Sequence, residues 1–161
     1  MLVGIMTDTH ENMENIRKAV DFFNKKGVEL VLHCGDIISP ITFKEFDRLN
    51  CRMELVFGNN DGERVFLVQR FREKGTFHVP GWESKLDNKK FIMMHEPVGV
   101  EALAESQKYN YIIYGHTHLQ DIRKIGKSLI INIGETGGWL NEISTIGILD
   151  TVKDEVKVIT L

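Results

Sequence analysis

Apolar runs of strand length alternate with segments of helical period along the first half of the chain. Between Asn12, a candidate N-cap, and Gly27 the apolar residues recur at i, i+3, i+4 and i+7. This spacing predicts one buried helix face, formed by Ile16, Ala19, Val20 and Phe23. We expect strands at 2–6, 29–33 and 52–57, and helices at 12–26, 39–50 and 63–74. In the second of these helices, Ser39 is the expected cap, Pro40 suits the first position, and Phe43, Phe46 and Leu49 form the expected buried stripe.

The second half of the chain is mostly β in character. Two β-like stretches surround a turn at 87–90, a short helix is expected around 99–107, and an apolar strand follows at 111–114. Two hairpins then turn at 126–127 and 153–154. We expect an α/β fold in a single domain, 1–161, in which two sheets pack together and helices lie outside them.

Composition indicates a soluble globular protein and excludes several functional classes. Of the 161 residues, 42% are apolar and 27% are charged, and the net charge of −3 argues against a dedicated nucleic-acid-binding surface. Cys34 and Cys51 cannot form a disulfide framework. The N-terminal residues lack the basic region of a signal peptide, and no apolar run reaches membrane-spanning length. We expect a cytoplasmic protein without a membrane partner.

Side chains that ligate metals follow five of the apolar runs directly. They are Asp8 and His10, Asp36, Asn59, His95, and His116 and His118. In open α/β sheets, ligands bind beyond the carboxyl ends of the strands, so strands lying side by side would bring these side chains together. Without a cation, such a cluster would cost several kcal/mol in desolvated polar and charged groups. The pattern therefore predicts a metal site.

The spacing of these residues favours two metal ions. In an extended segment, residues i and i+2 point the same way, so His116 and His118 are expected to aim at one region, as are Asp8 and His10. The glycines at 35, 58 and 115 each precede a candidate ligand and allow tight turns. Seven ligands are too many for one ion and fit two ions that share a carboxylate. Oxygen and nitrogen ligands without thiolate favour divalent ions; we expect Mn²⁺ or Ni²⁺ first, with Co²⁺, Fe²⁺, Zn²⁺ or Mg²⁺ as alternatives.

Taken together, the motifs resemble those of the calcineurin-like metallophosphoesterases, in particular the small YfcE-type phosphodiesterases of bacteria and archaea. The motifs are "DTH" (8–10), "GD" (35–36), "GNND" (58–61), a lone His95 and "GHTH" (115–118), and the likeness continues through "NIGETGGWL" near the C-terminus. The resemblance implies a four-layer α/β/β/α sandwich of two mixed sheets flanked by helices. It also implies one metal held by Asp8, His10, Asp36 and His118, and another held by Asp36, Asn59, His95 and His116. Self-association as a dimer or tetramer is common in the family.

We therefore hypothesise a metal-dependent phosphodiesterase that acts on a small phosphodiester through a hydroxide bridging the two metals. The expected catalytic residues are Asp36, Asn59, Asn60 and Asp61. Many superfamily members have a histidine, which protonates the leaving group, where this chain has Asn60. Asp61 is a poor acid at neutral pH, so slow turnover and a preference for good leaving groups are expected. The sequence "HEP" at 95–97 stands where the family commonly has "HGH". Glu96 therefore makes the rim of the expected site more acidic.

Two other functions fit parts of the pattern. The same fold serves as a non-catalytic retromer subunit that has lost part of its ligands, whereas this chain keeps all seven positions. A nuclease is disfavoured by the small size and the acidic balance of the chain. Each motif alone also has a structural interpretation, since "GD" and "GNND" are ordinary turn sequences. Their order at five strand ends is what favours metal binding.

Overall fold

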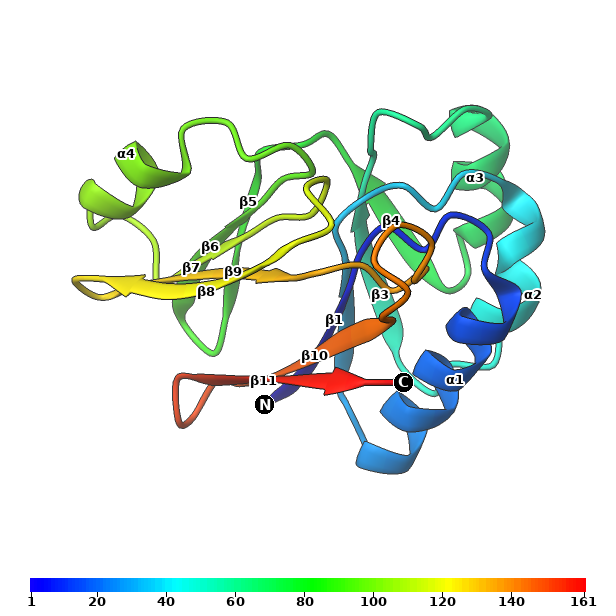
Figure 1. Cartoon of the computed structure of the whole chain (residues 1–161), viewed down its shortest axis with the longest axis horizontal. Coiled ribbons are helices and arrows are strands. Elements are labelled where there is room, and N and C mark those ends of the chain that lie inside the picture. The colour runs from blue at the N-terminus through cyan, green and yellow to red at the C-terminus, as the bar shows by residue number, and fades with distance from the viewer.

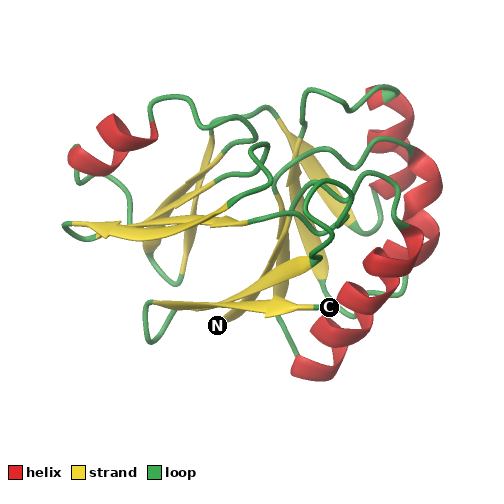
Figure 2. Ribbon diagram, in the orientation of Figure 1, coloured by secondary structure: helices red, strands yellow, loops and turns green.

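Two β-sheets pack face to face between two layers of helices in the computed structural model, which describes residues 1–161 (Figures 1 and 2). The first sheet has the order β11-β10-β1-β2-β3-β4. Its strands are β1 (Leu2–Met6), β2 (Leu30–His33), β3 (Arg52–Val56), β4 (Gly75–His78), β10 (Thr145–Asp150) and β11 (Glu155–Thr160). The second sheet has the order β5-β6-β7-β9-β8. Its strands are β5 (Trp82–Leu86), β6 (Lys89–Met93), β7 (Tyr111–Ile113), β8 (Gln120–Ile125) and β9 (Ser128–Ile133).

Three apolar clusters separate the four layers. Buried side chains of α1 (Met13–Lys26), α2 (Phe43–Phe46) and α3 (Arg64–Phe71) pack against the first sheet. The central cluster joins the sheets, with Ile5 and Leu32 from one facing Phe91 and Ile113 from the other. A third cluster lies between the second sheet and α4 (Val100–Glu105). The predicted sandwich of two sheets with helices outside is therefore confirmed.

The first helix forms as its sequence predicts. The side chain of Asn12 accepts a hydrogen bond from the Asn15 backbone N–H at 3.2 Å, and Gly27 ends the helix in the left-handed conformation with φ of 65°. All four residues of the expected apolar stripe are buried: Ile16, Ala19, Val20 and Phe23. The burial of this stripe is what fixes α1 on the sheet.

The segment 39–50 is less helical than predicted. A 3-10 turn, η1 (Pro40–Thr42), leads into the single turn of α2, and the Ser39 side chain makes no capping hydrogen bond. The expected stripe is nevertheless buried, because Phe43, Phe46 and Leu49 are 6%, 0% and 3% exposed. Residues spaced by three share a face in both a 3-10 helix and an α-helix, so this spacing does not distinguish the two. The apolar positions therefore predicted burial correctly and helix type poorly.

The β-like stretch predicted before the turn at 87–90 consists of two separate strands. β4 pairs parallel with β3 in the first sheet, whereas β5 pairs antiparallel with β6 in the second. The connection between them contains Gly81 with φ of 88°, and it carries the chain from one sheet to the other. The helices expected at 63–74 and 99–107 are also shorter, as α3 and α4 show.

The parallel strands place their carboxyl ends at one edge of the molecule. β1, β2 and β3 run parallel in the first sheet, and β6 and β7 run parallel in the second. The loops that follow them gather along the upper edge in Figure 1, away from both termini. No helix is both long enough and apolar enough to cross a membrane.

Candidate metal centre

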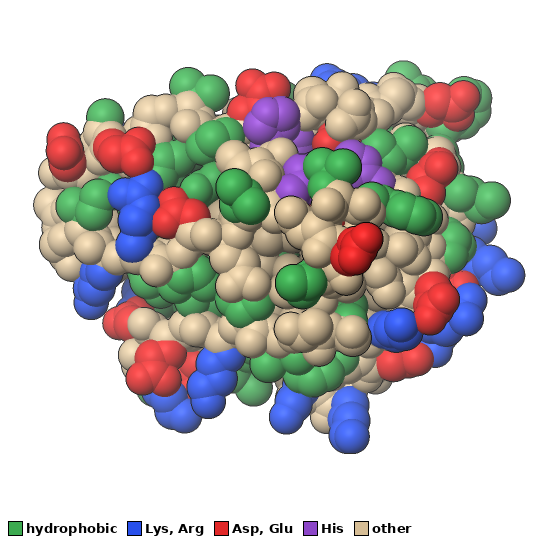
Figure 3. Space-filling view, in the orientation of Figure 1, with side chains coloured by type: hydrophobic (Ala, Val, Ile, Leu, Met, Phe, Trp, Pro, Cys, Tyr) green, Lys and Arg blue, Asp and Glu red, His purple; other side chains and the backbone are tan.

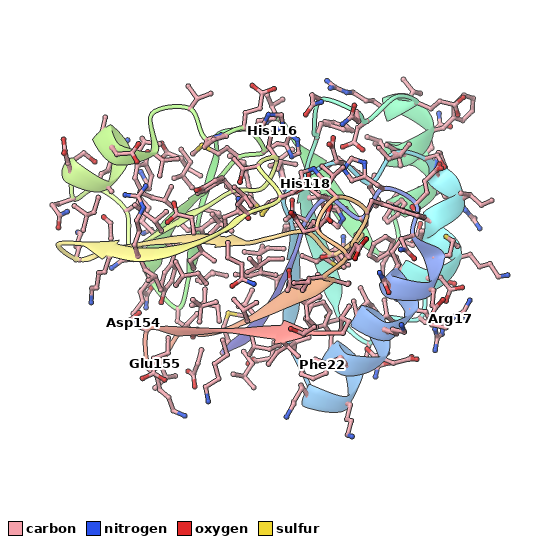
Figure 4. All side chains as sticks on the ribbon, in the orientation of Figure 1. Arg17, Phe22, His116, His118, Asp154 and Glu155 are labelled. Atoms are coloured by element: carbon pink, nitrogen blue, oxygen red, sulfur yellow. The ribbon has the colours of Figure 1, made fainter.

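All seven predicted ligand residues meet where the two sheets end. Asp8 and His10 follow β1, Asp36 follows β2, Asn59 follows β3, His95 follows β6, and His116 and His118 follow β7. Figure 3 shows histidine side chains gathered at the upper surface, and Figure 4 labels His116 and His118 on their loop. The first sheet therefore supplies four of these residues and the second supplies three.

Four side chains, here called the Asp8 set, form one half of the centre: Asp8, His10, Asp36 and His118. The Nε2 atom of His10 lies 3.8 Å from Asp8 Oδ1 and 3.6 Å from Asp36 Oδ2, and His118 Nε2 lies 3.5 Å from Asp8 Oδ1. Ligand atoms bound to one ion at about 2.1 Å are separated by roughly 3.0–3.4 Å. These atoms are close to that spacing.

A second group, here called the Asn59 set, consists of Asp36, Asn59, His95 and His116. Both His95 Nε2 and His116 Nδ1 lie 2.9 Å from Asn59 Oδ1, and the two nitrogens are 3.3 Å apart. Asp36 Oδ2 is 3.4 Å from His95 Nε2. The same Asp36 oxygen therefore faces both sets, as a carboxylate shared by two ions would.

The protein itself leaves ligand atoms of the Asp8 set without partners. Asp8 Oδ2 accepts hydrogen bonds from Thr7 Oγ1 at 2.6 Å and from the His116 N–H at 3.0 Å. In contrast, the buried atoms Asp8 Oδ1 and His10 Nε2 have no hydrogen-bond partner. A buried polar atom without a partner costs about 1–3 kcal/mol, and a cation at this position would satisfy both. The residues present therefore fit a metal ion.

The charges of the centre also fit a cation. The Asp8 and Asp36 side chains are 0% and 1% exposed, and their only ion-pair partners are histidines. Burial acts to raise the pKa of Asp36, but the interaction with His95 and the two hydrogen bonds from Asn60 outweigh it and hold that pKa below its usual range. Asp8 raises the pKa of His10. The two side chains are 3.8 Å apart, which exceeds hydrogen-bond length, so the cause is electrostatic attraction. Two ionised carboxylates at this depth require positive charge nearby.

Hydrogen bonds at the far side of two histidines turn the other nitrogen toward the centre. His95 Nδ1 lies 2.8 Å from the Cys34 carbonyl, which only accepts, so Nδ1 carries the proton and Nε2 has its lone pair free when the ring is neutral. His118 Nδ1 donates in the same way to the Glu135 carboxylate. Such outer hydrogen bonds fix the tautomer of metal-ligating histidines in proteins.

Left-handed backbone, and not strand alternation, directs the histidine pair after β7. His116 and His118 have φ of 67° and 58°, and both point into the centre as expected, His116 toward the Asn59 set and His118 toward the Asp8 set. Asp8, His10 and Asp36 also have positive φ. This conformation is costly for residues with a side chain and is concentrated at functional sites.

Of the glycines at 35, 58 and 115, two are required by close packing more than by turn geometry. Only Gly35 has a positive φ, of 101°. A Cβ atom at Gly58 would lie 2.1 Å from Asp36 Oδ1, and one at Gly115 would lie 2.0 Å from Thr7 Oγ1. These two glycines are needed because neighbouring loops approach so closely.

Asn60 and Asp61 both contact the Asp36 loop. The Asn60 backbone N–H and side-chain amide donate to the two Asp36 carboxylate oxygens at 2.8 and 2.7 Å. Asp61 is 4% exposed and accepts four backbone N–H groups, from Asp36, Ile37, Ile38 and Gly58. All of its in-plane acceptor positions are used, so Asp61 has no position left for a proton to give to a leaving group.

The sequence did not indicate Glu135 as part of the centre. Its buried carboxylate accepts from His118 Nδ1 and from the backbone N–H groups of Leu140 and Asn141 at 2.8 and 3.0 Å. Nothing in the sequence pairs Glu135 with His118. His33 is also buried, and burial lowers its pKa to about 4.

The chain belongs to the calcineurin-like phosphoesterase superfamily, whose domain description matches residues 1–154. It is 41% identical to phosphodiesterase MJ0936 of Methanocaldococcus jannaschii, over 100% of this chain and 99% of that protein. The solved structure of an archaeal phosphodiesterase covers all of both chains with 41% identity and a TM-score of 0.94. A Vps29 structure from Entamoeba histolytica, 17% identical, covers 100% of this chain and 98% of its own with a TM-score of 0.73, and so shares the fold. The predicted family and fold are confirmed.

Proposed function

We propose that this protein is a dinuclear metal-dependent phosphodiesterase acting on a small phosphodiester. The observation that carries the proposal is the shared Asp36 Oδ2, which lies between two groups of ligand atoms spaced for one ion each. The membership of the chain in a phosphoesterase family and its 41% identity to a phosphodiesterase support it.

The Asp8 set would hold one divalent cation and the Asn59 set the other, with Asp36 belonging to both. Bound divalent cations supply Lewis acidity toward a phosphate and lower the pKa of water toward about 7. Oxygen and nitrogen ligands without thiolate favour divalent ions, Mn²⁺ or Ni²⁺ among them, over a sulfur-selective site. The role of the chain is to hold the proton of each neutral ring on Nδ1, through Cys34 for His95 and Glu135 for His118, so that Nε2 faces the centre.

Asn60 and Asp61 have supporting roles in this proposal. The Asn60 amide has no titratable proton, so it can orient the Asp36 carboxylate but cannot protonate a departing alkoxide. Asp61 organises the backbone of two ligand loops through its four accepted hydrogen bonds. General acid catalysis is worth typically 10²–10⁴-fold, so its absence implies slow turnover and reliance on good leaving groups.

The test is metal content together with hydrolysis of an activated aryl phosphodiester. Protein stripped of metal and reloaded with Mn²⁺ or Ni²⁺ should bind two ions per chain and release the aryl alcohol. Asp36→Asn should lower both the metal content and the rate to background, while Asp47→Asn, at an exposed position, should change neither. Undiminished turnover by the Asp36 variant would end the proposal.

A non-catalytic scaffold of the same fold is the second candidate. The fold shared with Vps29 and the absence of a titratable group at Asn60 favour it. A scaffold would bind metal without hydrolysing any aryl phosphodiester above the rate of free metal. The metal analysis and the hydrolysis assay together separate the two functions.

A further inference from the structure

An apolar cavity of about 420 Å³ opens beside the Asn59 set. We call it the Met94 pocket; its apolar walls are Phe57, Pro80, Ile92, Met94, Val98 and Leu103. Asn59 and His95 form part of the same wall, so the pocket and the candidate metal centre are continuous. This volume lies in the range of about 300–1,000 Å³ that small-molecule sites occupy.

The walls of the pocket come from both sheets and are held by the core. Ile92 and Met94 are 7% and 5% exposed and belong to the cluster beneath α4. Phe57 stacks on Phe77, with ring centroids 4.8 Å apart. Because these side chains are anchored from below, the pocket is formed before any ligand binds.

The rim of the pocket has no net charge. Arg64 and Glu96 are its charged residues, and both are exposed. The Arg64 guanidinium lies 4.9 Å from the Phe57 ring centroid and donates to the carbonyl oxygens of Asp61 and Gly58. Glu96 makes no side-chain hydrogen bond or ion pair, so its negative charge opposes an anionic group entering there.

We propose that the Met94 pocket binds an uncharged aromatic ester group of the substrate while its phosphate lies at the metal centre. The proposal rests on the proposed function, because it places the phosphate next to Asn59 and His95. It names the substrate class more closely: a diester with at least one aryl or similarly flat apolar group. An aromatic ring fills such a cavity with large apolar area at little entropic cost.

Two phosphinates that cannot be hydrolysed provide the test, because both keep the anionic phosphorus centre and replace the ester oxygens by P–C bonds. Binding of diphenylphosphinate and dimethylphosphinate to the Mn²⁺-loaded protein is measured by calorimetry. Burial of one ring should make the diphenyl compound bind on the order of tenfold tighter or more. The ratio of the affinities for the diphenyl and dimethyl compounds should fall toward one in two variants. Val98→Asp places a charge at the mouth of the pocket, and Leu103→Trp fills the cavity.

Val152→Asp is the matched control. Val98 and Val152 are 72% and 80% exposed, and Val152 lies in the turn between β10 and β11, outside the pocket. This control should keep the preference for the diphenyl compound. Equal binding of the two phosphinates by the parent protein, or a preference unchanged in both pocket variants, overturns the proposal.

Failure of the pocket and failure of the proposed function give different results. A protein that hydrolyses aryl phosphodiesters without any diphenyl preference contradicts the pocket alone. A protein that prefers diphenylphosphinate but hydrolyses no diester contradicts the proposed activity and leaves the pocket as a binding site for an aryl group next to an anion.

Discussion

The two halves of the centre differ in how far the protein satisfies their ligand atoms. In the Asn59 set, His95 and His116 both lie within hydrogen-bond distance of Asn59 Oδ1. In the Asp8 set, Asp8 Oδ1 and His10 Nε2 are buried without a partner. A cation entering the Asp8 set would relieve a standing desolvation cost, whereas one entering the Asn59 set must displace the hydrogen bond that His116 Nδ1 can donate to Asn59 Oδ1. We therefore expect the Asp8 set to bind metal first and more tightly.

The largest expected effect on this difference in metal affinity comes from removing one histidine from each set in turn. His10→Ala should weaken the tighter binding step by more than the roughly 10–100-fold that loss of an outer partner costs. His116→Ala should weaken only the second step, because its ring faces Asn59. Titration of metal-stripped protein with Mn²⁺ in a calorimeter resolves the two steps. A tight step lost in the His116 variant and kept in the His10 variant would reverse the assignment.

A substitution at Glu135 should weaken metal binding to the Asp8 set alone, and by a smaller factor. Glu135→Gln removes the charge that orients His118 and should weaken Mn²⁺ binding to this set by about 10–100-fold, with Glu135→Asp recovering part of the loss. The exposed neighbour Glu142→Gln is the control. If Glu135 only supported the loop, thermal stability without metal would fall while Mn²⁺ affinity remained unchanged.

Gly115→Ala tests how closely the loop after β7 packs against the loop that carries Asp8. The added Cβ would lie 2.0 Å from Thr7 Oγ1 and 2.7 Å from Asp8 Oδ2, so the β1 and β7 loops must separate. Overpacking of this kind costs about 1–3 kcal/mol, which urea unfolding measures. Gly62→Ala, where nothing lies within 4 Å, should leave stability nearly unchanged. Equal stability of both variants would show that the loops accommodate the methyl group freely.

The smallest expected effect is the pH dependence of the metal-free protein. The pKa of His10 and of His95 is raised in the folded chain, so their stabilisation is complete below about 6.5 and is lost as the pH rises through the folded pKa values. The pKa of His33 is lowered to about 4, so its contribution has the opposite sign: present above about 6.5 and lost toward pH 4.

Stability without metal should therefore be greatest near pH 6.5, as measured by urea unfolding across pH 5–9. With Mn²⁺ bound, the decline on the alkaline side should disappear, because the cation takes the place of the protons on the ligand histidines. A decline of the same size with and without Mn²⁺ would mean that these histidines do not bind the metal.

The sequence by itself determined the seven polar residues at the strand ends, the buried stripe of α1 and the family to which the chain belongs. These features are local, because an apolar run and the residue after it are adjacent in the chain. The two ligand sets were implied by the family resemblance, but only the tertiary structure brings their members together, since Asp8 and His118 come from different sheets. It also decided that Glu135 holds His118, that Gly58 and Gly115 are required by close approach, and that a pocket adjoins the centre. Each of these depends on contacts between loops that are distant along the chain, which local sequence periodicity does not encode.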